Sequence, residues 1–244
     1  MVYVVGAEQK QHFEMVFASA RKSGLIDSRH TTNHVPFGLV LGPGGGKLKS
    51  RSGGAVKLLD LLNEAIDRAS ASVKGRNPDI TQEELGRLSR SIGIGAVKYS
   101  DLKSDRTKDY VFDWEKMLSF EGETGPYLQY AHARISSILR NDKFQQSKSG
   151  PTSFSLAHES EMRLAREIMK YPESVDQAAE DLAPHRICKQ LHRLSQAFAA
   201  FYENCPVLVE DGNTRNERLA LCRITGGILN HGLNLLGIDA PDRM

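Results

Sequence analysis

The sequence predicts an α/β portion followed by an all-helical bundle, with helix as the main structure overall. Two short apolar runs, residues 1–6 and 34–41, are typical of buried strands, and an amphipathic helix follows the first. Beyond residue 113 the pattern changes to long apolar stripes at helical spacing, separated by polar segments and prolines. We therefore expect two domains, residues 1–113 and 114–244.

Composition places the chain among ordinary globular proteins. It has 244 residues, of which 40% are hydrophobic and 25% charged, enough to bury a core. The net charge of +2 does not announce a nucleic-acid binder, although a local basic face would be sufficient. Neither a signal peptide nor an apolar run long enough to span a bilayer is visible, which indicates a cytoplasmic chain. Cys188, Cys205 and Cys222 lack metal-ligand spacing and are expected to be buried free thiols, and we expect no metal site.

The first predicted strand leads into a helix. Phe13, Val16, Phe17 and Ala20 fall at positions i, i+3, i+4 and i+7 of that helix. Gln9 then lies near the carboxyl end of the strand, which is the edge where open α/β sheets bind ligands. The alternative is that Gln9 simply begins the helix. A chain that opens inside a buried strand also suggests that neighbouring strands belong to an upstream part.

The second predicted strand leads into a glycine-rich turn and a basic loop. A Walker A loop needs four residues between its glycines and a hydroxyl residue after its lysine, but three separate Gly42 from Gly46 and Leu48 follows Lys47. Residues 47–52 carry three cations and two hydroxyls, which can wrap a polyphosphate and balance charge that develops during phosphoryl transfer. The alternative is a solvated basic loop.

Helices account for most of the remaining chain. Apolar spacing predicts helices over residues 56–69, 159–169, 184–201 and 219–236. Thr81 and Glu84 form a capping box at the start of another, and Gly237 suits the position that closes the last one.

One helix, beginning after Thr124, is the most informative. Thr124 is a good N-cap, and Pro126 lies in the first turn, where its missing N–H costs nothing. Tyr127, Tyr130 and Arg134 share one face, and two phenol rings with a guanidinium suit stacking on unpaired bases and neutralising phosphates. Spacing alone favours the simpler interpretation, in which the tyrosines cover the edge of the core.

Several literal strings point to one family. Residues 122–134, Gly-x-Thr-Gly-Pro-Tyr-Leu-Gln-Tyr-Ala-His-Ala-Arg, closely resemble the helix that opens the anticodon-binding domain of arginyl-tRNA synthetases. Residues 5–13, Val-Gly-Ala-Glu-Gln-x-x-His-Phe, resemble the segment after the arginine pocket of the same family. The strings at residues 95–102 and 236–244 are also similar to segments of that family.

The resemblance implies a fold and an activity. Residues 1–113 would be the later part of a class I Rossmann catalytic domain, and residues 114–244 a DALR-type helical anticodon-binding domain. The parent enzyme would activate L-arginine with ATP, Mg²⁺ being carried by the ATP, and transfer it to tRNA(Arg). A HIGH-type motif is absent from the 244 residues, so this chain, expected to be a monomer, should not be a competent ligase alone. The alternatives are an RNA-binding module without catalysis and an assembly protein that uses its apolar helices as a partner surface.

The same resemblance implies roles for individual residues. Gln9 would touch the substrate arginine. The basic loop resembles the family's counterpart of the KMSKS loop, with Leu48 and Ser50 departing from its usual Phe-Lys-Thr-Arg-Ser-Gly form. Its catalytic residues would be Lys49, Ser50 and Arg51. The ATP-binding residues would be His12, His34, Gly38, Lys47, Lys49 and Arg51. The tRNA-binding residues would be Tyr127, Gln129, Tyr130, His132, Arg134 and Met244.

Overall fold

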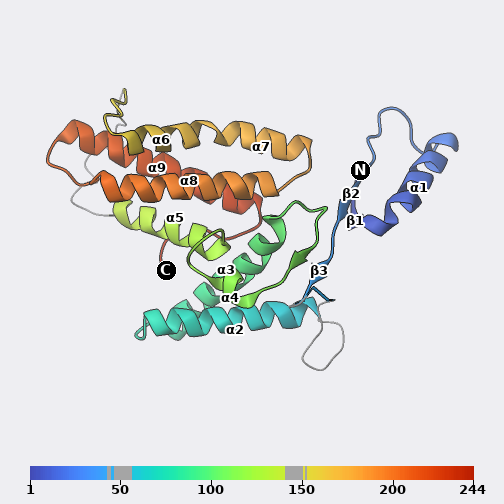
Figure 1. Ribbon diagram of the computed structural model, residues 1–244, viewed down its shortest axis with the longest axis horizontal. Coiled ribbons are helices and arrows are strands. Elements are labelled where there is room, and N and C mark those ends of the chain that lie inside the picture. Colours follow the sequence, from blue (N-terminus) through green and yellow to red (C-terminus); the bar gives the residue numbers. More distant parts are fainter. Residues whose placement is uncertain (43–44, 47–56, 141–150, 152) are drawn as a thin grey trace. The chain divides into compact units, whose positions relative to one another are not determined.

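The computed structural model describes residues 1–42, 45–46, 57–140, 151 and 153–244 (Figure 1). The chain forms two compact units. The first comprises Met1–Val56 with Ser104–Asp113, and the second comprises Lys57–Lys103 with Trp114–Met244.

The first unit contains two pairs of parallel strands. β1 (Val2–Gly6) pairs with β2 (Asn33–Phe37), and β3 (Val40–Leu41) pairs with β4 (Tyr110–Val111). A short 3-10 turn, η1 (Ala7–Gln9), and helix α1 (Lys10–Lys22) connect β1 to β2. Parallel strands joined through a helix are the α/β arrangement predicted for this part of the chain.

The first unit differs from the expectation in two respects. The run predicted as one strand over residues 34–41 is split, because the backbone N–H of Gly38 donates to the carbonyl of Arg106 (2.7 Å) and that of Leu39 to Asp109 Oδ1 (2.6 Å). As a result, the first part of this run pairs with β1 and the last part pairs with β4. In addition, β1 was expected to be buried, yet Val2 and Val4 are exposed, because among the described strands β1 pairs only with β2.

The regular elements that the structure describes in the second unit are all helices (Figure 1). Its helices are α2 (Leu58–Arg76), α3 (Gln82–Leu102), α4 (Trp114–Leu118), α5 (Gly125–Leu139), α6 (Glu159–Met169), α7 (Tyr171–Glu180), α8 (His185–Asn204) and α9 (Gly212–Leu235). Both predicted N-cap hydroxyls accept a hydrogen bond from the first turn of their helix. Thr81 Oγ1 accepts from the N–H of Glu84 (3.3 Å), and Thr124 Oγ1 accepts from the N–H of Tyr127 (3.1 Å). The predicted mostly helical fold is therefore confirmed.

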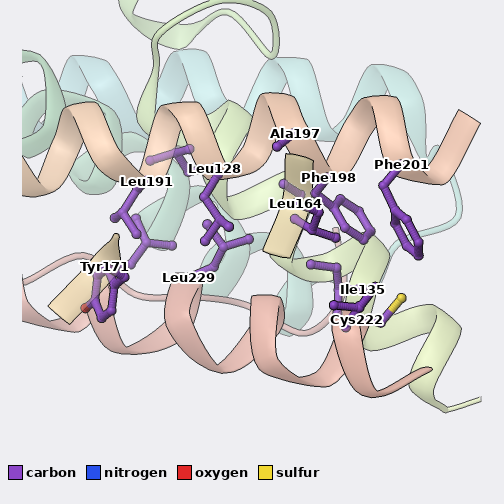
Figure 2. Packing of buried hydrophobic residues seen from close by; sticks show 14 of the residues in the cluster. Leu128, Ile135, Leu164, Tyr171, Leu191, Ala197, Phe198, Phe201, Cys222 and Leu229 are labelled. Atoms are coloured by element: carbon purple, nitrogen blue, oxygen red, sulfur yellow. The ribbon is translucent and has the colours of Figure 1, made fainter. Parts of the chain in front are cut away.

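The main core lies among α5, α6, α8 and α9 (Figure 2). Leu128, Leu191 and Leu229 are fully buried there, each on a different helix. The three cysteines are free and buried, as predicted. Burial raises the pKa of Cys188 to about 12, so its thiol stays protonated and unreactive at neutral pH.

A close approach of two backbones fixes α5 against α3. A Cβ on Gly125 would lie 2.8 Å from the carbonyl oxygen of Gly95, so only glycine fits at this crossing. The hydroxyl of Tyr99, also on α3, donates to the carbonyl of Cys188 on α8 (3.3 Å). These contacts hold the α2–α3 hairpin on the helical bundle and set the walls of the site described below.

A buried ion pair joins α6 to α9. Arg218 Nε donates to Glu161 Oε1 (2.7 Å), and Arg218 Nη1 donates to the carbonyl of Pro206 (2.8 Å). Glu161 Oε2 accepts from the backbone N–H of His158 (3.0 Å). Burial by itself would raise the pKa of Glu161, but the His158 hydrogen bond and Arg218 together hold it below its ordinary value.

Candidate functional site

The second unit contains a hollow of about 770 Å³ between helices. Its walls come from the α2–α3 corner, from α5, from the end of α8 and from the last three residues of the chain. Three of the six predicted tRNA-binding residues line it, namely Tyr130, Arg134 and Met244. Helical spacing on α5 and the course of the C-terminal segment bring these three side chains together.

Two cations and three aromatic rings form a row, of which Tyr130, Arg134 and Tyr202 line this hollow. The guanidinium carbon of Arg134 lies 5.2 Å from the ring centre of Tyr130 and 5.1 Å from that of Tyr202. The ring of Phe120 meets that of Tyr130 edge-on, with 6.4 Å between centres, and the guanidinium of Arg76 lies 3.9 Å from the centre of Phe120. We call these five residues the cation–aromatic row.

The row has the chemistry that unpaired nucleotides require. Tyr130 and Tyr202 are 37% and 41% exposed, so part of each side chain can be reached by a nucleotide. Arg134 is exposed and lies against two rings, which restricts its guanidinium before any phosphate or base edge is bound. Single-stranded RNA is bound in this way, by stacking on aromatic rings and by pairing phosphates with arginine.

Tyr127 does not join the row. It is half-buried against the main core, and its ring centre lies 5.8 Å from that of His192 on α8. Burial raises its pKa, against the smaller lowering effect of Arg134. Although Tyr127 and Tyr130 were expected to share one face, Tyr127 covers the edge of the core, which is the simpler of the two interpretations that the spacing allowed.

Gln129 and His132 also lie away from the hollow. Gln129 is fully buried and His132 is 5% exposed. Both side chains contact the C-terminal segment, through the carbonyls of Asp239 and Pro241. Neither is open to solvent, so we leave both out of the RNA interface that we propose below.

Sequence reasoning missed Tyr202, Phe120 and Arg76. Tyr202 follows the buried Phe201 directly, so a tyrosine placed just off an apolar stripe was the available signal. The pairing of Tyr202 with Arg134 depends on how α5 packs against α8, which spacing along either helix does not reveal.

The first unit positions the predicted arginine and ATP residues. Gly6 and Phe37 are register partners, so Gln9 and Gly38 follow the carboxyl ends of adjacent parallel strands. Gln9 and His12 are exposed, whereas His34 is half-buried. A Cβ on Gly38 would lie 2.7 Å from the carbonyl of Lys108, so close backbone contact explains this glycine. Lys47, Lys49, Ser50 and Arg51 lie outside the described residues.

His34 is held in place within this unit. Its Nε2 lies 3.1 Å from the carbonyl oxygen of Val5, and its ring stacks on Phe13 with 5.1 Å between centres. Phe13 in turn contacts Tyr3, so the imidazole belongs to an aromatic cluster between α1 and the strands. His34 therefore supports the edge at which Gln9 lies.

Two general features of the described residues complete the description. Grouped His, Cys, Asp and Glu side chains suited to a metal ion are not found in this part of the chain. Of the helices that the structure describes, none combines the length and apolarity that crossing a membrane demands.

Comparison with known proteins assigns both halves of the chain. Residues 1–114 match the model for the catalytic domain of class I tRNA synthetases (R), and residues 128–244 match the model for the DALR anticodon binding domain. The chain is 44% identical to an arginine–tRNA ligase of Proteus mirabilis and 46% identical to one of Frankia casuarinae. The whole chain is covered in both cases, together with 42% and 41% of those relatives.

Solved structures agree with this assignment. The arginyl-tRNA synthetase of Thermus thermophilus matches with a TM-score of 0.86 at 32% identity, and that of Plasmodium falciparum with 0.82 at 31%. Each match covers all of this chain and 41% of the solved one, so the chain spans about two fifths of the length of these relatives. The chain therefore belongs to the arginyl-tRNA synthetase family of class I aminoacyl-tRNA synthetases.

Proposed function

We propose that this chain is the C-terminal portion of an arginine–tRNA ligase, which joins L-arginine to tRNA(Arg) in protein synthesis in the cytoplasm. Residues 1–113 would contribute the later part of the catalytic domain, and residues 114–244 the anticodon-binding domain. The matched ranges 1–114 and 128–244 support this division. The α2–α3 hairpin would belong to the catalytic domain by sequence while packing on the anticodon-binding helices.

The proposed reaction has two steps. The carboxylate of arginine attacks the α-phosphorus of ATP, so that arginyl-adenylate forms and pyrophosphate leaves. A ribose hydroxyl at the end of the tRNA then attacks the arginyl carbonyl carbon and releases AMP. Both steps place negative charge on oxygens, which cations aimed at those oxygens stabilise.

The residues of the first unit would serve these steps from one edge. Gln9 and Gly38, at the carboxyl ends of adjacent parallel strands, lie where α/β sheets bind substrates. Gln9 would contact the arginine, with His12, His34 and Gly38 on the ATP side. Lys49, Ser50 and Arg51, with Lys47, would hold the triphosphate, whose Mg²⁺ arrives with the ATP.

The cation–aromatic row is the observation that carries the RNA half of the proposal. Its exposed rings and central guanidinium fit unpaired anticodon bases and their phosphates. Tyr127 stays a predicted contact at the margin of this surface. Because the whole row belongs to the second unit, an RNA-binding module without catalysis is the second candidate function.

A chimeric enzyme tests the ligase proposal. The match to the Proteus mirabilis ligase covers the whole of this chain, so the chain should be able to replace the matched segment of that enzyme. We expect the chimera to charge tRNA(Arg) with arginine. The double substitution Lys49→Ala and Arg51→Ala should abolish charging while leaving tRNA binding intact. A folded chimera that binds tRNA(Arg) but does not charge it would favour the module without catalysis.

A further inference from the structure

One face of α5 holds the C-terminal segment of the chain. Gln129 Nε2 donates to the carbonyl of Asp239 (2.8 Å), His132 Nδ1 lies 3.1 Å from the carbonyl oxygen of Pro241, and Ser136 Oγ donates to Asp242 Oδ1 (2.9 Å). Gln129, His132 and Ser136 follow one another at spacings of three and four, which places them on one helix face. We call these three side chains the tail clamp.

The tail clamp continues an anchor at the end of α9. Gly237 has a φ of 66°, the left-handed conformation that commonly ends a helix. Its carbonyl accepts a hydrogen bond from Lys98 Nζ on α3, and the next residue, Ile238, is 1% exposed. The segment therefore leaves α9 through a fixed turn, buries one side chain and then runs along α5.

The chemistry of the clamp residues suits fixed contacts with backbone. Gln129 is fully buried, and its Nε2 also lies 3.3 Å from the carbonyl and the hydroxyl of Ser91. Buried polar groups are costly unless they are hydrogen-bonded, so these bonds hold the NH2 group of Gln129 in place, whereas its Oε1 has no hydrogen-bond partner among the described residues. His132 must carry a proton on Nδ1 to donate to a carbonyl oxygen.

The tail clamp fixes the position of the last residue, Met244. Met244 is half-buried, packs against a small apolar cluster that includes Val73, Leu85 and Leu88, and lines the hollow beside two rings of the cation–aromatic row. Within the described part of the chain, the side-chain hydrogen bonds to residues 239–242 come from α5. A wall of the hollow thus depends on side chains that face away from it.

We propose that Gln129, His132 and Ser136 are positioning residues for RNA binding. They fix the C-terminal segment so that Met244 completes the hollow, and they affect bound nucleotides only through that segment. This rests on the proposed function of the hollow as the RNA site. It replaces a direct tRNA contact by Gln129 and His132 with an indirect role.

The first measurement follows the release of Met244 by carboxypeptidase Y under native conditions. The double substitution His132→Leu and Ser136→Ala removes two hydrogen bonds to the tail and should speed release by about tenfold or more. The single variant His132→Asn keeps a donor at this position and keeps the native Ser136. It should therefore release Met244 slowly, in contrast to the double variant. Ile168→Val, which trims one methylene group on α6 rather than on α5, is the matched stability control and should leave the rate unchanged.

The second measurement is tRNA binding in two backgrounds. In the 244-residue chain, the double substitution should weaken binding of tRNA(Arg) by about fivefold to tenfold, a loss typical of removed hydrogen bonds. In a chain that lacks residues 243–244, the same substitutions should have no further effect, because the residue they position is gone. Equal losses in both backgrounds would overturn the proposal.

The outcomes separate this inference from the function on which it rests. If Tyr130→Ala weakens tRNA binding but the double substitution His132→Leu and Ser136→Ala does not, the positioning role is wrong and the RNA site stands. If the unmodified chain binds no tRNA, the proposed function and the positioning role both fail, whatever the carboxypeptidase rate.

Discussion

Substitution of Arg134 by alanine is expected to weaken the binding of tRNA(Arg) by about 10- to 100-fold, which is the usual loss for a stacked or phosphate-pairing residue. Arg134 lies between Tyr130 and Tyr202, so its removal takes away a charge and also the group that aligns the two rings. Fluorescence anisotropy with labelled tRNA at several salt concentrations measures the effect. If Arg134 pairs with a phosphate, the slope of log K against log salt should fall by about one.

Arg163 provides the control for this prediction. It lies on α6, is exposed, and does not line the hollow, so Arg163→Ala makes the same change in net charge elsewhere. The control variant should bind within about twofold of the unmodified chain, because distant exposed charges are largely screened. Similar losses for Arg134→Ala and Arg163→Ala would mean that overall charge, rather than the row, attracts RNA.

Substitution of Arg218 by methionine is expected to lower the free energy of unfolding by about 3–5 kcal/mol, because it leaves a buried carboxylate without its partner. The side chains of Arg218 and Glu161 are only 14% and 6% exposed, and the variant also loses the bond to the carbonyl of Pro206. Urea unfolding followed by circular dichroism gives the value. The double variant Glu161→Gln/Arg218→Met should recover part of the loss, whereas strictly additive effects would contradict the coupling.

The stability that the Glu161–Arg218 ion pair contributes should depend on pH. The pKa of Glu161 is lower in the folded chain than in the unfolded one, so its stabilising contribution is fully present above the unfolded pKa. That contribution is lost as pH falls through the folded pKa. The stability difference between the unmodified chain and Glu161→Gln should therefore shrink in acid below the ordinary range of glutamate. A difference that stays constant to low pH would contradict the lowered pKa.

Local patterns predicted most of the fold. The apolar stripes predicted α8 and α9, and Thr81 and Thr124 cap the helices that they were expected to begin. The split between β2 and β3 escaped prediction, because it depends on hydrogen bonds from Gly38 and Leu39 to residues about 70 positions away. The residues around Gly38 and Leu39 do not indicate that these distant partners exist.

The site was predictable only in part for the same reason. Tyr130, Arg134 and Met244, for which the family resemblance implied tRNA contacts, lie together around the hollow, and their binding of tRNA stays a prediction. Gln129 lies on the same helix but contacts a segment 110 residues away, and its position in the string does not reveal that it faces inward. Tyr202 enters the row through packing of α8 against α5, which the stripe on α8 does not specify.

Discrimination between tRNAs tests the central claim most directly. A gel shift of the 244-residue chain with one arginine tRNA and one unrelated tRNA, repeated across a range of salt, separates phosphate attraction from base recognition. We expect affinity for both RNAs to fall as salt rises, with tRNA(Arg) bound more tightly throughout and Tyr130→Ala reducing that preference. Equal affinity for the two tRNAs at every salt concentration, or no binding to either, would contradict an RNA-reading role for the hollow.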